Sequence, residues 1–373
     1  MTNSRRIAET SRRKRQLVES SIVAAVLALS VLGAVSYLAW LDRDDRIGVD
    51  FRASTWEPGN AILEGAPPYP DPGSVRLDSF PALYMPPYML LFAPFSVLPF
   101  DVATGLWLVA LSASIVAALW IAGLRDLRCY AIALLSLPVI AALGAGNTTA
   151  LLMLSTALLW KWRDRPHHGA AAFACALLIK PLLWPLFVWL LVTRRVRLAL
   201  EAAVVAPLVA LVGWAAIGFD GLADYPALLR AHGETMASNG LLLTNLLLDA
   251  GMSYWGAAGV SLVLGACVLV GSIWVRDDLK IFTLGVAAAL VMTPVMFVHY
   301  FMLLYVPLAA RYARFSLVWL APLPLWFIAV RYELDGTRPL WASVVGLLVL
   351  GAILVSLVWR RVSAARATRP ASL

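Results

Sequence analysis

Residues 22–40, IVAAVLALSVLGAVSYLAW, form a continuous apolar run without a charged side chain. A helix needs about 20 such residues to cross the hydrocarbon core of a bilayer, so the run predicts a membrane-spanning helix. The residues before it, 1–19, are rich in arginine. A cleaved signal peptide has a shorter apolar core of about 7–15 residues, so we expect this span to be retained and the basic tail to lie in the cytoplasm.

The composition of the whole chain extends this interpretation. The 373 residues are 61% hydrophobic and 14% charged, with a mean hydropathy of +0.80. Soluble domains are about 45–50% apolar and about 25% charged, so the sequence predicts an all-α, polytopic membrane protein. The net charge of +8 lies in short loops and at the termini. Membrane topology explains this distribution, and we expect no nucleic-acid binding.

Apolar runs and basic loops together predict about twelve membrane segments, some of them short, with both termini in the cytoplasm. We expect a single transmembrane domain over 20–360, between basic cytoplasmic tails at 1–19 and 361–373. Its two long loops on the outer face are predicted at 42–87 and 219–254.

Two stretches are predicted to depart from simple spans. The run 88–98 is too short to cross, so we expect it to dip into the membrane or lie on its surface. The run 169–192 is followed by basic residues that favour the cytoplasm. Two short helices that meet at Lys180-Pro181 satisfy this charge pattern, because proline interrupts a helix.

Polar side chains that are costly in hydrocarbon fall at the predicted outer ends of helices. They are Asp50, Tyr84, Asn147, Lys180 and His299. Four of them have a structural explanation on their own: Asp50 as a solvated loop acid, Asn147 as a turn residue, Lys180 as a snorkelling lysine and His299 as a histidine at a helix end. Because they converge on one face, we expect a functional site there.

Asp50 is the candidate general base. Its loop is crowded with aromatic residues and proline, which favours packing and partial desolvation, and desolvation raises a carboxyl pKa toward the range that suits a base. Rival acids in the same loop are Asp42, Asp44, Asp45 and Asp78. Lys180 is a candidate for binding phosphate as a point charge, and the turn at 144–149 is a candidate for contacting a polar ligand.

The sequence has no H-E-x-x-H, G-x-S-x-G, Walker or G-x-G-x-x-G motif, so metal and nucleotide chemistry lack support. The three cysteines lie in or beside apolar runs without a CxxC, which favours a packing role.

The order of several short motifs resembles glycosyltransferase family 87, a branch of the GT-C membrane enzymes that includes actinobacterial polyprenol-phosphate-mannose-dependent α-mannosyltransferases. The resembling pieces are Asp50-Phe51, Gly65-Ala66-Pro67-Pro68-Tyr69, Tyr84-Met85-Pro86-Pro87, Gly146-Asn147, Lys180 with Pro185, and Thr293-Pro294 with His299-Tyr300. The chain departs from the usual family pattern at Ala145 and Phe297, and it has a single histidine in the last motif.

The resemblance implies a GT-C helical bundle with its active site on the periplasmic side of the plasma membrane. The sugar, mannose by resemblance, would come from a polyprenyl phosphate, and the acceptor would be an envelope glycolipid or lipoglycan. Transfer would invert the anomeric centre without a metal or other cofactor. Asp50 would be the base, and Tyr69, Tyr84, Asn147 and Tyr300 would bind substrate. We further expect Lys180, His299 and Arg52 to bind the donor phosphate, and we expect no obligate protein partner.

Other functions remain open at this stage. A polyprenyl-phosphoarabinose donor is the nearest alternative within the enzyme class. A transporter or flippase of lipid-linked sugars is the alternative outside it. Such proteins carry charges midway through their helices and often show internal repeats, and this sequence shows neither feature clearly. A non-catalytic scaffold that retains the fold is the third alternative.

Overall fold

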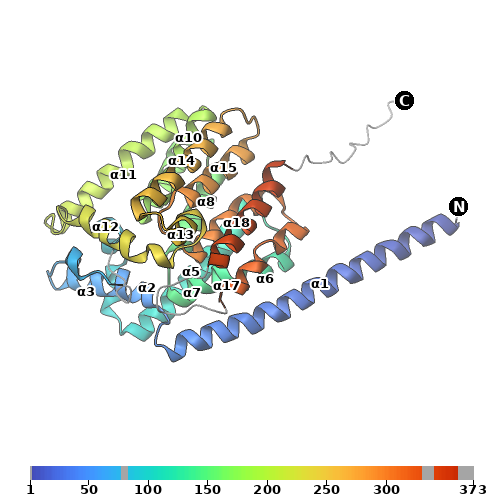
Figure 1. The fold of residues 1–373 in the computed structure, drawn as a ribbon, viewed down its shortest axis with the longest axis horizontal. Helices are drawn as coiled ribbons and strands as arrows, with labels where there is room; N and C mark the ends of the chain where they lie inside the picture. The colour runs from blue at the N-terminus through green and yellow to red at the C-terminus, as the bar shows by residue number, and fades with distance from the viewer. Residues whose placement is uncertain (1, 77–82, 330–339, 360–373) are drawn as a thin grey trace.

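A computed structural model describes residues 2–76, 83–329 and 340–359, with side chains from residue 20 onward. All regular secondary structure in these ranges is helical (Figure 1). The first half contains α1 (Thr2–Arg43), α2 (Val49–Phe51), η1 (Arg52–Trp56), α3 (Glu57–Leu63), η2 (Pro72–Ser74), α4 (Pro86–Phe92), η3 (Ala93–Val97), α5 (Phe100–Ala122), α6 (Leu127–Leu134), α7 (Leu137–Ala145), α8 (Thr149–Lys161), α9 (Pro166–Ile179) and η4 (Pro181–Leu183). The second half contains α10 (Leu186–Val192), α11 (Val196–Ala216), α12 (Tyr225–Met236), η5 (Ala237–Asn239), α13 (Leu242–Asp249), α14 (Tyr254–Ser272), α15 (Asp278–Met292), η6 (Val298–Leu304), α16 (Tyr305–Arg311), η7 (Leu317–Leu320), η8 (Leu323–Leu325), α17 (Trp326–Ala329), α18 (Leu340–Leu354) and η9 (Val355–Trp359).

Five helical stretches within the described ranges are long and apolar enough to cross a membrane: Ser20–Arg43, Phe100–Ala122, Val196–Ala216, Tyr254–Ser272 and Leu340–Trp359. A sixth crossing is possible if α6 and α7, which meet at a bend of 56°, count as one span. The other apolar helices are shorter than a bilayer requires, α8 and α9 among them. The structure therefore supports five or six membrane crossings, and the rest of the twelve stay a prediction.

The two stretches predicted to depart from simple spans are both made of short helical pieces in the structure. Residues 86–97 form two short helices, α4 and η3, with neither long enough to cross. The helix α9 ends at Ile179, and Lys180 is extended with φ −150° and ψ 125° before η4 begins at Pro181. A residue before proline disfavours the α conformation, so the break is encoded locally.

The predicted cytoplasmic loops meet one another. The Asp278 carboxylate accepts hydrogen bonds from Arg195 Nη1 at 2.8 Å and from Arg163 Nε at 3.0 Å, which joins the loops after α8 and α10 to the start of α15. The Arg125 amide donates to the Ala313 carbonyl at 2.9 Å, which joins the loops after α5 and α16.

The predicted outer segments also meet one another. The Gly48 amide donates to the Gly144 carbonyl at 2.8 Å, Tyr225 Oη donates to the Leu83 carbonyl at 2.6 Å, and the Leu241 amide donates to the Met296 carbonyl at 2.7 Å. These contacts join predicted outer segments to one another, as the contacts above join predicted cytoplasmic loops. Which set faces the cytoplasm stays a prediction from the basic residues.

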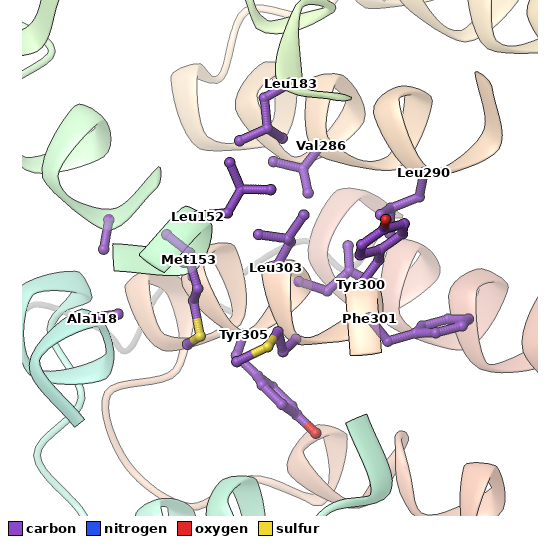
Figure 2. Packing of buried hydrophobic residues seen from close by; sticks show 14 of the residues in the cluster. Ala118, Leu152, Met153, Leu183, Val286, Leu290, Tyr300, Phe301, Leu303 and Tyr305 are labelled. Carbon is purple, nitrogen blue, oxygen red and sulfur yellow. The ribbon is translucent and has the colours of Figure 1, made fainter. Parts of the chain in front are cut away.

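The centre of the core is formed by η6 and α16. Every residue of η6 is buried, and Figure 2 shows Tyr300, Phe301 and Leu303 among apolar side chains of α8 and α15. The helix α1 instead runs along the edge of the bundle (Figure 1). It contacts α17 where Gly33 lies against the Trp326 ring, which a Cβ at Gly33 would approach to 3.0 Å. The end of α1 lies against α7, where Leu41 packs on Gly144.

Candidate active site

Asp50 lies on α2, the first turn of a helical stretch that continues through η1 and α3. This turn is anchored on both sides. Gly48 begins the turn with φ 74°, and a Cβ at this position would lie 2.8 Å from Thr104 Cγ2. Phe51 is fully buried and stacks on Trp107 at 5.1 Å between ring centroids. Because its neighbours are fixed by packing, the half-buried Asp50 side chain has a defined direction.

That direction is toward the turn between α7 and α8. Asn147 Nδ2 donates a 2.6 Å hydrogen bond to Asp50 Oδ2. The Asn147 Oδ1 atom accepts from the Thr149 amide at 3.0 Å and from Thr149 Oγ1 at 2.6 Å. These two bonds fix the orientation of the amide, so its NH₂ group must face the carboxylate.

Gly146 permits this approach. Its φ of 70° ends α7, and a Cβ there would lie 2.8 Å from Phe51 Cβ. The Gly146 carbonyl accepts from Trp107 Nε1 at 2.9 Å. A glycine at 146 is therefore needed both for the backbone conformation and for the close contact with α2.

Burial raises the pKa of Asp50 above its ordinary value of 3.8, and the Asn147 hydrogen bond and the Lys180 charge offset part of that rise. Three rival acids, Asp42, Asp44 and Asp45, are exposed. The fourth, Asp78, lies outside the described residues. Of the described acids in this loop, we therefore keep Asp50 as the candidate base.

Lys180 supplies a positive charge close to Asp50. Its Nζ donates to Tyr300 Oη at 3.0 Å and lies 4.8 Å from the Tyr300 ring centroid and 5.4 Å from that of Tyr84. Tyr84 Oη in turn accepts from Thr148 Oγ1 at 2.8 Å. The ammonium and the carboxylate thus share one site, because Tyr84 connects Lys180 to the turn that holds Asp50.

Tyr69 supports Tyr84 from outside this group. Tyr69 Oη donates to the Tyr84 carbonyl at 2.8 Å, and its ring stacks on Trp214 at 5.2 Å. Gly221 lies so close that a Cβ there would be 2.9 Å from the Tyr69 ring. The two predicted outer loops therefore meet at Tyr69. Tyr69 contacts the backbone of Tyr84 and supports its position.

The two remaining predicted residues, His299 and Arg52, have different neighbours. His299 is buried next to Tyr300, with ring centroids 4.6 Å apart, so it borders the Lys180 group. Arg52 lies over the Phe100 ring at 4.1 Å and pairs with Asp45 at 3.9 Å. The contacts of Arg52 do not bring it to Lys180, and its predicted phosphate contact stays a prediction.

The structure adds residues that sequence reasoning missed. Trp107 holds the turn against the Asp50 helix, and Tyr225 attaches α12 to Leu83. His232, also on α12, is close enough to Lys180 for that charge to lower its pKa. The only available signal was the amphipathic pattern of 225–236, which indicates a packed face without saying what it packs against.

The arrangement combines a carboxylate of raised pKa with an ammonium group bordered by aromatic rings. It can take a proton from a hydroxyl group and stabilise an anion beside it. Among the residues that the structure describes, no group of three or more histidine, cysteine or acidic side chains could hold a metal ion.

Comparison with known proteins identifies the family. No curated protein and no solved structure matches the chain. The model of glycosyltransferase family 87 matches residues 82–295, more than half of the 373 residues. The match includes Tyr84, Asn147 and Lys180, begins after Asp50, and ends before His299. The family and the helices that are long enough to cross a membrane both indicate a membrane protein. The chain belongs to glycosyltransferase family 87.

Proposed function

We propose that this glycosyltransferase moves a sugar, mannose, from a polyprenyl phosphate to a hydroxyl group of an envelope glycolipid or lipoglycan on the outer face of the membrane. Asp50 is the general base, and Lys180 binds the phosphate that leaves. The observation that carries the proposal is the 2.6 Å hydrogen bond between Asn147 and Asp50 in a site that also contains the Lys180 ammonium group.

The reaction needs one base and one stabilised leaving group. Asp50 takes the proton of the acceptor hydroxyl as its oxygen attacks the anomeric carbon. The bond between that carbon and the phosphate oxygen breaks, and the phosphate keeps the electron pair. Attack from the face opposite the leaving group inverts the anomeric centre. We propose no metal in this step, because Lys180 supplies the positive charge that the leaving phosphate requires.

The raised pKa of Asp50 supports its role. A base works best when its pKa lies near the working pH, and burial moves the pKa of Asp50 in that direction. The residue is only partly buried, and we propose that the acceptor hydroxyl reaches the carboxylate from its exposed side. The hydrogen bond from Asn147 keeps one carboxylate oxygen in place while the other remains for the acceptor.

The location of the site supports a lipid-linked donor. The site is built from segments that the basic-residue pattern assigns to the outer face. Nucleotide sugars are not available there, whereas a polyprenyl phosphate carries its sugar within the membrane. Mannose is proposed from the resemblance of the short motifs to mannosyltransferases, and periplasmic orientation from the arginine-rich tail before the first span.

The test is sugar transfer in membranes that contain either the wild type or Asp50→Asn. Asparagine keeps the size of the side chain and an oxygen that can accept from Asn147, but it cannot act as a base. Each membrane is given polyprenyl-phosphate-mannose or polyprenyl-phosphoarabinose with envelope glycolipid acceptors. Transfer of mannose by the wild type, lost in Asp50→Asn at equal expression, is the expected result.

Other outcomes would change the proposal in defined ways. Transfer of arabinose alone would retain the mechanism and replace the donor. Equal transfer by both proteins would remove Asp50 from the mechanism. A product with the same anomeric configuration as the donor would exclude inversion. Failure of the wild type with both donors, although it is folded and inserted, would contradict the enzymatic proposal.

A further inference from the structure

The helix α12, in the second predicted outer loop, packs against the first predicted outer loop next to the site. Tyr225 at its start donates to the Leu83 carbonyl at 2.6 Å, directly beside Tyr84. Residues seven apart on a helix lie on the same face, so Tyr225 and His232 both belong to the face that packs inward. The burial of Leu228 and Met236 on this face agrees with that assignment, whereas Arg230 on the other side is exposed.

His232 has an unsatisfied atom on this inward face. Its Nδ1 is buried and has no hydrogen-bond partner among the described residues. A buried polar atom without a partner is uncommon in folded proteins, and at a binding site it indicates a group that a ligand completes. The ring is within reach of the Lys180 charge, and Lys180 is the residue to which the donor phosphate is assigned above.

The charge state of His232 is consistent with such a partner. Burial, and then the charge of Lys180, lower the pKa of His232 to about 4. The imidazole is therefore neutral at neutral pH, with one ring nitrogen protonated and the other not. A neutral ring beside an ammonium group adds a directional hydrogen bond without adding a second repelling charge.

We propose that His232 is a further substrate-binding residue, whose Nδ1–H donates a hydrogen bond to a phosphate oxygen of the lipid-linked donor beside Lys180. This inference rests on the proposed function, because it places the donor phosphate between α12 and Lys180. The bond would also tie α12 to the bound donor. Loss of the bond would weaken binding of any ligand that carries this phosphate.

The experiment measures binding of a short-chain polyprenyl phosphate to purified full-length protein in lipid nanodiscs. The variants His232→Ala and His232→Phe lack a hydrogen-bond donor. The variant His232→Asn keeps one, because its amide nitrogen is bonded to Cγ, as Nδ1 is in histidine. Arg230→Ala is the matched control on the exposed face of α12. The uncharged polyprenol and inorganic phosphate are measured alongside, to separate contributions of the tail and of the phosphate.

A hydrogen bond to a charged group contributes enough that its loss should weaken the Kd for polyprenyl phosphate by about tenfold in His232→Ala and His232→Phe. We expect His232→Asn to stay within about threefold of the wild type, because it retains a donor at this position. The Kd for polyprenol should be the same in all variants, and Arg230→Ala should bind polyprenyl phosphate with the wild-type Kd. Weaker binding of inorganic phosphate in the same two variants would show that the phosphate alone is recognised.

Three results would overturn the inference. The first is equal binding of polyprenyl phosphate by wild type and His232→Phe. The second is an equal loss for polyprenol, which would indicate a packing role. The third is unchanged donor binding with a raised KM for the acceptor, which would assign the imidazole to the acceptor. A wild type that binds no polyprenyl phosphate would instead contradict the proposed function itself.

Discussion

Asn147 and Asp50 are 97 residues apart in the chain, and a 2.6 Å hydrogen bond joins them. The bond has a fixed polarity, because Thr149 occupies the Asn147 oxygen from two directions. The carboxylate therefore receives a donor that cannot flip. This hydrogen bond is the contact through which the turn at 144–149 orients the side chain of Asp50, the candidate base.

We predict that Asn147→Ala lowers kcat by roughly 10- to 100-fold, because a hydrogen bond to a charged group contributes about 1.5–3 kcal/mol. The variant leaves the Lys180 group in place, so donor binding should change little. Steady-state kinetics with donor and acceptor varied separately would measure this split. A wild-type kcat in Asn147→Ala would show that the amide does not position the base.

The pH dependence of kcat/KM should show an acid limb set by Asp50. The base is active when deprotonated, so activity falls as the pH drops through its pKa, which burial raises above 3.8. In Asn147→Ala, loss of a bond that favours the ionised form raises this pKa further. The acid limb should therefore move to higher pH in the variant, and a limb that moves to lower pH would contradict the assignment.

Gly146→Ala should disrupt the contact between α7 and α2. The position has φ 70°, and the new Cβ would lie 2.8 Å from Phe51 Cβ. The left-handed conformation alone costs an alanine about 1–2 kcal/mol. We expect a lower melting temperature and a loss of transfer. Gly105→Ala is the control, because no atom lies within 4 Å of a Cβ added there. Equal stability of the two variants would refute the argument.

Lys180→Met should lower kcat/KM by about 100-fold, because it removes the positive charge from the leaving phosphate while an unbranched side chain of nearly the same length is kept. Tyr300→Phe keeps the ring but removes the hydroxyl that accepts from Lys180 Nζ at 3.0 Å, so a smaller effect is expected. Kinetics of the two variants with a common donor would test this order. A larger loss in Tyr300→Phe would show that the hydroxyl, rather than the ammonium, serves the reaction.

Features encoded by neighbouring residues were predictable from the sequence. The break at Lys180-Pro181 and the end of α7 at Gly146 depend on proline and glycine, whose backbone effects are local. The number of crossings was harder to predict. Hydropathy alone does not distinguish a short span from a buried segment such as η6, all of whose residues are buried.

Sequence proximity was a weaker guide than the predicted topology. Arg52 is two residues from Asp50, and residues two apart on a helix point in nearly opposite directions. The structure accordingly places Arg52 over Phe100. His232 had no recognisable motif, and its place beside Lys180 depends on how α12 packs against the first loop through Tyr225.

The most direct test of the central claim is single-turnover transfer by purified wild type and Asp50→Asn, with the Kd for the donor measured on the same preparations. General-base catalysis typically contributes about 10²–10⁴-fold to a rate, so we predict a loss of this size in the transfer rate of Asp50→Asn. Its donor Kd should stay within a few-fold, because Lys180 is unchanged. A wild-type transfer rate in Asp50→Asn would contradict the assignment of Asp50 as the base.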